Sequence, residues 1–181
     1  MKQIAGILVS SLLLLPLAAD ASISTKANSS NTSTYVSQIT NTGPWSSIRV
    51  QYTNDKTLPI LTLTKTDSRD YLFSDRTQLV TDGVASDLKL MATYRNPTGF
   101  RTQTSSLGRY EFTPTQIASI QNAKNVSLQV SFRNTSTITW KVSEKVLNEW
   151  KEILARGQSQ VSLQKTPISI DNHSPITGNQ P

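Results

Sequence analysis

Few residues in this chain have the chemistry that catalysis or metal binding requires. The sequence contains no Cys and a single His, His173, which lies between Asn172 and Ser174 in a Pro-containing C-terminal stretch. Without Cys and with one His, thiolate sites, cysteine nucleophiles and multi-histidine metal sites are excluded. A Ser-His-Asp triad needs a buried and oriented imidazole, which a polar terminal stretch does not supply. We therefore predict no catalytic residue, no metal site and no cofactor.

Carboxylate chemistry has one group of candidates, because five aspartates lie close together in the sequence. They are Asp67, Asp70, Asp75, Asp82 and Asp87. Two carboxylates facing one cleft would support hydrolysis, but this spacing does not correspond to an EF-hand calcium loop. Asp beside Gly or Ser is typical of turns. We interpret these residues as turn residues and keep a carboxylate-dependent hydrolase as a remote alternative.

One set of basic residues predicts binding. The chain has 18 Lys and Arg against 12 Asp and Glu, a net charge of +6. Side chains that alternate with core positions in a strand point outward, and apart from Glu111 the outward charges are basic. The predicted binding residues are Arg49, Lys89, Arg95, Arg101, Arg109, Arg133 and Lys141. Such residues can bind a polyanion or an acidic protein, or can protect strand edges from aggregation. The sequence leaves open whether they share one sheet.

Alternation of apolar and polar residues predicts the strands that position this basic set. The inward positions are Ile48, Val50 and Tyr52; Leu88, Leu90, Ala92 and Tyr94; Val126, Leu128, Val130 and Phe132; and Ile138, Trp140 and Val142. Clusters of turn residues, such as those at positions 96–99, separate the runs. We expect about seven antiparallel strands.

Two helices interrupt this pattern. Thr113 is a good N-cap and Pro114 suits the first helical position, where its missing N–H needs no partner. After Ser143, apolar residues follow helical spacing up to Gly157, which is placed to end that helix. The predicted fold class is α+β and mainly antiparallel β, as a sandwich or curved sheet. It includes one short helix and one longer C-terminal amphipathic helix.

The chain divides into four predicted segments. Residues 1–21 combine Lys2, a short apolar run and Ala19-Asp20-Ala21, the pattern of a secretory signal peptide cleaved after Ala21. Residues 22–44 are interpreted as a Ser/Thr/Asn-rich linker or arm, in which 35–39 could pair with the chain's own sheet or a neighbour's. Residues 45–157 form a single β-rich domain, and residues 158–181 form a flexible tail.

Together these features predict an exported, non-enzymatic interaction protein. We expect bacterial export to the periplasm or the outside of the cell, with no transmembrane segment after signal cleavage. An envelope adaptor, an inhibitor or an assembly subunit would act through protein–protein contacts there. The alternative is a binder of anionic lipid or glycan through the basic outward strand face. Nucleic acid is not expected, because no recognised motif is present and the aromatic residues mostly alternate inward.

Overall fold

The computed structural model describes residues 22–29, 32–54, 58–97 and 103–164, and it has an α+β fold with two antiparallel sheets and two helices. This confirms the predicted mainly antiparallel fold class, although these described residues contain ten strands and not about seven. The larger sheet contains, in spatial order, β1 (Ser22–Ser29), β2 (Thr32–Thr42), β3 (Trp45–Thr53), β4 (Ile60–Asp67), β8 (Thr104–Glu111) and β7 (Lys89–Pro97). The smaller sheet contains β10 (Ile138–Lys141), β9 (Val126–Val130), β5 (Gln78–Thr81) and β6 (Val84–Asp87).

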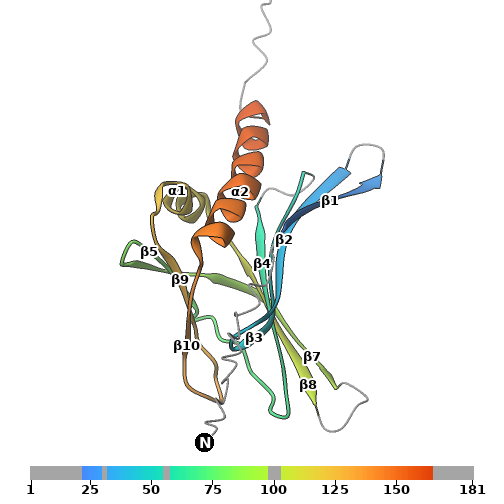
Figure 1. Ribbon diagram of the computed structural model, residues 1–181, viewed down its shortest axis with the longest axis vertical. Coiled ribbons are helices and arrows are strands. Elements are labelled where there is room, and N and C mark those ends of the chain that lie inside the picture. Colours follow the sequence, from blue (N-terminus) through green and yellow to red (C-terminus); the bar gives the residue numbers. More distant parts are fainter. Residues whose placement is uncertain (1–21, 30–31, 55–57, 98–102, 165–181) are drawn as a thin grey trace, which may run out of the picture.

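The core lies between the two sheets and beneath the helices (Figure 1). Trp45, Phe73 and Phe132 form an aromatic cluster between the sheets, with the Phe73 and Phe132 ring centroids 5.1 Å apart. At the helix end, Trp150 packs against Phe112 and Trp140. The core therefore contains two groups of aromatic contacts, one between the sheets and one that includes helix α2.

Helix α1 (Pro114–Asn122) begins as the sequence predicts. Thr113 Oγ1 accepts a hydrogen bond from the Gln116 N–H, and Gln116 Oε1 accepts one from the Thr113 N–H, which completes a capping box. Gln116 is buried and also donates to the Asp87 carbonyl at 2.8 Å. The same side chain thus caps the start of the helix and fixes it to the end of β6.

Helix α2 (Glu144–Gln164) is longer than the sequence predicts. Its apolar residues at the predicted spacing are buried, but the helix continues past Gly157 and does not end there. A glycine inside a helix costs only about 1 kcal/mol relative to alanine, which the rest of the helix can tolerate. Part of the predicted flexible tail is therefore helical. Within the described residues, neither helix has the length and apolar character needed to cross a bilayer.

The interpretation of residues 22–44 as a linker or loose arm is wrong, because they form β1 and β2 of the larger sheet. Strand β2 pairs with β3 over eight residue pairs, and it places Ile39 and Ser37 in the core. The low apolar content was misleading. A strand that joins an existing sheet satisfies its backbone hydrogen bonds there and needs few apolar side chains of its own. The pairing of 35–39 is with the chain's own sheet.

Strand β7 departs from simple alternation at Met91. Leu90 pairs with Tyr110, and Ala92 pairs with Arg109, the very next position along β8, so Met91 is an extra residue in a β-bulge. For the residues of β7 that follow the bulge, each side chain lies on the face of the sheet opposite to the one predicted. Leu88 and Leu90 face the core as predicted, whereas Ala92 and Tyr94 lie on the outer face with Arg109.

Candidate functional site

Two of the predicted basic residues lie in one cross-strand row on the outer face of the larger sheet. Arg49 of β3 pairs with Thr62 of β4, and Thr62 pairs in turn with Arg109 of β8. Directly paired antiparallel residues point to the same side of a sheet. The two guanidinium groups are therefore on the same face, with one threonine between them.

The two arginines flank an open groove of about 400 Å³. Its walls also include Gln51, Thr62 and Asn96, and no carboxylate lines it. Both helices lie on the other side of this sheet (Figure 1), where the Ser37 hydroxyl meets Glu149 of α2. No described helix or strand covers the groove. A concave, uncovered surface with two positive charges is suited to an anionic ligand.

Arg49 is held in place by a neutral partner. Its Nε donates to Gln38 Oε1 at 2.9 Å, and its Nη2 donates to the same oxygen. Gln38 is the directly paired residue on β2. Because the partner is an amide and not a carboxylate, the contact orients the guanidinium without neutralising it. The remaining donors of Arg49 are available to an anion in the fork geometry that suits carboxylates and phosphates.

Arg109 also has no carboxylate partner within the described part of the chain. The nearest acid along β8 is Glu111, whose Oε2 accepts from Lys89 Nζ at 2.8 Å across the β7–β8 pair. That ion pair uses the one acidic side chain that the sequence places on this face. The groove therefore keeps the charges of both Arg49 and Arg109.

Tyr94 completes the groove, and sequence reasoning missed it. Its side chain is 50% exposed and lines the groove beside Leu107, the residue with which it pairs on β8. The alternation pattern predicts an inward tyrosine, because a β-bulge leaves no mark in the sequence of its own strand. Gln51 and Asn96 were missed for a different reason. They are ordinary polar strand residues, and only the register shows that they surround the arginines.

The other predicted binding residues are not part of this groove. Arg95 lies on the opposite side of the larger sheet, since it pairs with the buried Ser106, and its Nη1 donates to Asp70 Oδ2 at 3.1 Å. Lys141 belongs to the smaller sheet, and Arg133 follows β9, where its N–H donates to the Leu72 carbonyl. Arg101 lies outside the described residues. The seven residues thus do not form one face.

The five aspartates all have hydrogen-bonding or ion-pair partners within the fold. Asp82 is the clearest case, because its carboxylate accepts the backbone N–H groups of Lys124 and Asn125 at 2.7 to 3.1 Å. These hydrogen bonds, first of all that from Asn125, lower the pKa of Asp82. The others contact Tyr71 and Ser68 (Asp67), Arg95 (Asp70), Ser74 (Asp75) and Gln78 (Asp87). Asp70, Asp75 and Asp82 lie in turns or loops as predicted, whereas Asp67 and Asp87 are the last residues of β4 and β6.

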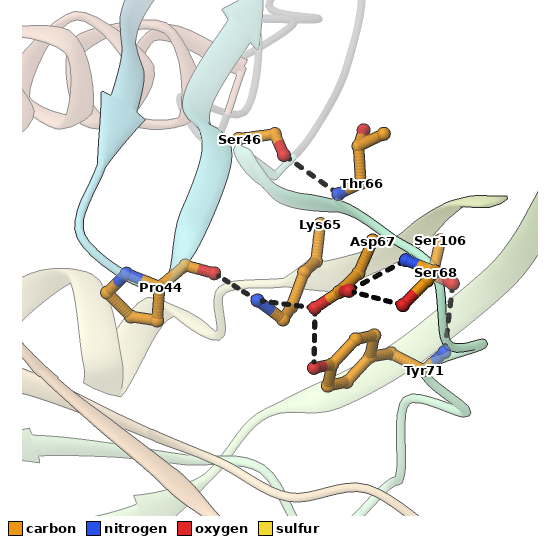
Figure 2. A network of polar contacts seen from close by, with 8 residues as sticks. All are labelled: Pro44, Ser46, Lys65, Thr66, Asp67, Ser68, Tyr71 and Ser106. Carbon is orange, nitrogen blue, oxygen red and sulfur yellow. Dashed lines mark hydrogen bonds and ion pairs between the residues drawn. The ribbon is translucent and has the colours of Figure 1, made fainter. Parts of the chain in front are cut away.

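A second polar cluster contains a lysine, an aspartate and a tyrosine (Figure 2). Lys65 Nζ donates to the Pro44 carbonyl at 2.9 Å and lies 3.7 Å from Asp67 Oδ2, which also accepts from Tyr71 Oη at 3.1 Å. Hydrogen bonds from the Ser68 N–H and from Tyr71 lower the pKa of Asp67, while burial and the contact with Asp67 raise the pKa of Tyr71. The Lys65 side chain is only 14% exposed.

This cluster connects three parts of the chain, and the charged and hydroxyl groups of Lys65, Asp67 and Tyr71 all have partners within it. The Lys65 ammonium has a carbonyl, a carboxylate and the Tyr71 ring, 4.8 Å away, as partners. Ser106 Oγ accepts the Tyr71 N–H at 3.0 Å and adds β8 to the network. Its contacts fix the β2–β3 turn and the loop after β4 to the sheet. We assign it a structural role.

The groove between Arg49 and Arg109 is therefore the candidate site. Within the residues described, no group of three or more His, Asp or Glu side chains is placed to hold a metal ion. His173, the remaining imidazole, lies outside those residues. The comparison with known proteins adds no assignment: no family model matches the chain, and neither a curated protein nor a solved structure is significantly similar to it.

Proposed function

We propose that the protein is a non-enzymatic binding protein that holds a negatively charged ligand in the groove between Arg49 and Arg109. The observation that carries this proposal is the cross-strand row in which the two arginines flank Thr62 with no carboxylate in the groove. The N-terminal pattern of residues 1–21 supports export, so the ligand would be met in the periplasm or outside the cell. The nearly empty inventory of catalytic residue types supports binding over catalysis.

Two arginines that bind the same anion are expected to give a higher affinity than one arginine alone. One exposed ion pair contributes at most about 1 kcal/mol in water. Two guanidinium groups that reach the same anion supply several charge-assisted hydrogen bonds at once. Because Gln38 already orients Arg49, less side-chain entropy is lost when the ligand binds. We therefore expect both arginines to be needed for measurable affinity.

The test is binding to dextran sulfate, measured by fluorescence anisotropy of the labelled polyanion. The double variant Arg49→Gln/Arg109→Gln is compared with Arg133→Gln/Lys141→Gln, which loses the same charge from outside the groove. We expect at least about tenfold weaker binding for the first and less than about twofold for the second. Affinity should also fall as salt rises, because the contacts are electrostatic. Equal losses in the two double variants would remove the proposal.

A second candidate function is contact with a protein partner along β7. This strand has β8 on one side and no described strand on the other. Met91 and Tyr94 are both about half exposed, and exposed apolar residues on an edge strand are common at interaction surfaces. A photocrosslinking residue placed at Met91 should capture one specific partner in the native envelope, while the same residue at Thr139 of β10 should not. Identical capture from both positions would argue against this function.

A further inference from the structure

We infer that the ligand of the groove is an acidic carbohydrate, whose anionic group is bound by Arg49 and Arg109 and whose sugar ring lies against Tyr94. This inference rests on the proposed function and adds the class of ligand. It depends on three properties of the groove: an exposed aromatic ring beside the charges, polar side chains around it, and the absence of an apolar slot.

The first property is the position of Tyr94. It pairs with Leu107, two residues before Arg109 on β8, while the small side chain of Ala92 is opposite Arg109 itself. The tyrosine ring is half exposed and lines the same groove as the two arginines. An aromatic ring offers an apolar surface for the C–H face of a sugar, and its hydroxyl adds a polar group at the edge.

The second property is the supply of hydrogen-bonding groups. Besides the arginines, the groove is lined by Gln51, Thr62 and Asn96, which provide two amides and a hydroxyl. Gln51 Nε2 has only a long contact, 3.5 Å, with Thr53 Oγ1. These groups can donate and accept at the same time, as the hydroxyls of a sugar require. Inorganic anions would use the arginines and leave the amides without a role.

The third property distinguishes a sugar from a lipid. An acyl chain needs a continuous apolar slot, but five of the seven residues that line the groove are polar or charged. The other strongly exposed apolar side chains among the described residues, Val84 and Met91, are not part of it. A groove of about 400 Å³ lies in the range of small-molecule sites. Its size and lining therefore favour one or two sugar units.

The test is calorimetric titration of the full-length protein, first with three ligands. The ligands are a tetragalacturonate, its carboxyl-reduced neutral counterpart, and vesicles that contain phosphatidylglycerol. We expect the acidic tetrasaccharide to bind, the neutral one to bind at least about tenfold more weakly, and the vesicles not to compete. A sulfated tetrasaccharide is a fourth arm that separates sulfate esters from carboxylates as the anionic group.

Variants of Tyr94 give the decisive result. Tyr94→Ala should weaken tetragalacturonate binding about five- to tenfold, while Tyr94→Phe, which keeps the ring, should stay within about twofold. Met91→Ala is the matched control, because it removes an equally exposed apolar side chain of the same strand. Thermal unfolding of each variant confirms that the fold is retained.

The outcomes separate this inference from the proposed function. If the phosphatidylglycerol vesicles bind in an Arg49- and Arg109-dependent manner while neither acidic tetrasaccharide binds, the carbohydrate inference is overturned and the anion site stands. Tetrasaccharide binding that is unchanged in Tyr94→Ala would also overturn it. If no anion binds through the two arginines, both the carbohydrate inference and the proposed anion-binding function are wrong.

Discussion

Phe73 packs its ring directly against Gly108, so closely that a Cβ atom on residue 108 would lie 2.6 Å from the Phe73 Cγ. Phe73 also forms an isolated β-bridge with Phe132, and its ring contacts those of Trp45, Phe132 and Tyr110. Because Gly108 has no side chain, the Phe73 ring fits against β8, and this contact positions the loop after β4 between the sheets. No flexible group is available to move aside, because Phe73 is fully surrounded by the core.

The first prediction follows from this contact. Gly108→Ala should lower the free energy of unfolding by about 1 to 3 kcal/mol, the usual cost of overpacking a core. Chemical denaturation measures the change. Phe73→Leu in the same chain should recover part of that loss, because it removes the ring that the new methyl group meets. If the two substitutions have simply additive effects, the close contact does not limit position 108.

The second prediction concerns the buried hydroxyl of Tyr110. Its Oη lies 2.9 Å from Thr77 Oγ1 and 3.3 Å from the Ser74 carbonyl, to which it donates, and burial raises the pKa of Tyr110 to about 12. An exposed tyrosine has a pKa of 10.0. The folded state therefore resists deprotonation, and stability is lost as the pH rises from about 10 toward 12, by about 2 kcal/mol in total.

Alkaline denaturation of Tyr110→Phe tests this explanation. The variant should be about 1 kcal/mol less stable than the wild type at neutral pH, because the hydroxyl loses its hydrogen bonds. The difference should shrink above pH 10 and reverse as the pH approaches 12, because the wild type then loses more stability than the variant lacks and the phenylalanine has no proton to lose. In the wild type, phenolate absorbance should show one tyrosine that ionises only near pH 12. A constant difference at every pH would contradict the assignment.

The third prediction uses Asp82, which adopts a positive φ of 47° in the β5–β6 turn. Its carboxylate accepts the N–H groups of Lys124 and Asn125, so its pKa is below the ordinary 3.8. A lowered pKa stabilises the fold above that value, and the contribution disappears as the pH falls below it. Asp82→Asn keeps the turn conformation, since asparagine tolerates positive φ, but removes the charge.

We expect Asp82→Asn to be less stable than the wild type at pH 6 and to approach it near pH 3. Urea denaturation across this range measures the difference. Asp75→Asn is the control, because it removes the same charge from a side chain that accepts only from the neighbouring Ser74 hydroxyl. A control that behaves like Asp82→Asn would show that net charge, and not the contact with residues 124 and 125, causes the effect.

The fourth prediction concerns the attachment of α2 to the larger sheet. Ser37 is buried, and its Oγ donates to Glu149 Oε2 at 2.7 Å. Glu149→Ala leaves this hydroxyl without its acceptor and should cost about 1 to 3 kcal/mol. Ser37→Ala in the same chain should restore part of the stability, as a double-mutant cycle would show.

Glu152→Ala is the matched control on the same helix. Glu152 is exposed and pairs with Arg156 one turn later, at 2.8 Å, a contact worth only a few tenths of a kcal/mol. Equal costs for the Glu149 and Glu152 variants would mean that the contact with Ser37 does not hold the helix to the sheet.

Much of the fold could be predicted from local patterns. Val126, Leu128 and Val130 are buried at alternate positions as predicted, and Thr113 caps α1. These features depend on residues within one strand or one helix. The hairpin of β1 and β2 could not be recognised in this way, because its stability comes from β3 and α2. A pattern internal to a polar segment contains no information about the sheet that it will join.

The site was predictable only in part, for a related reason. Arg49 and Arg109 were expected to point outward, and the register places them in one row. Which residues surround them depends on pairings between distant strands. Because of the bulge at Met91, Tyr94 and Arg95 lie on the opposite sides of the sheet from those that alternation predicts, so Tyr94 lines the groove and Arg95 does not.

The extra residue Met91 changes which side of the sheet each later residue of β7 faces. After the bulge at Met91, the pairing with β8 continues without a further shift from Ala92 to Pro97. In a chain without this residue, regular strand geometry alone would place Ala92 and Tyr94 on the outer face with the same partners on β8. Such a chain would also present a straighter outer strand to other molecules, since a bulge hinders pairing between sheet edges. The bulge at Met91 therefore affects how the outer edge of β7 can pair, while the register of Tyr94 and Arg109 in the groove does not require it.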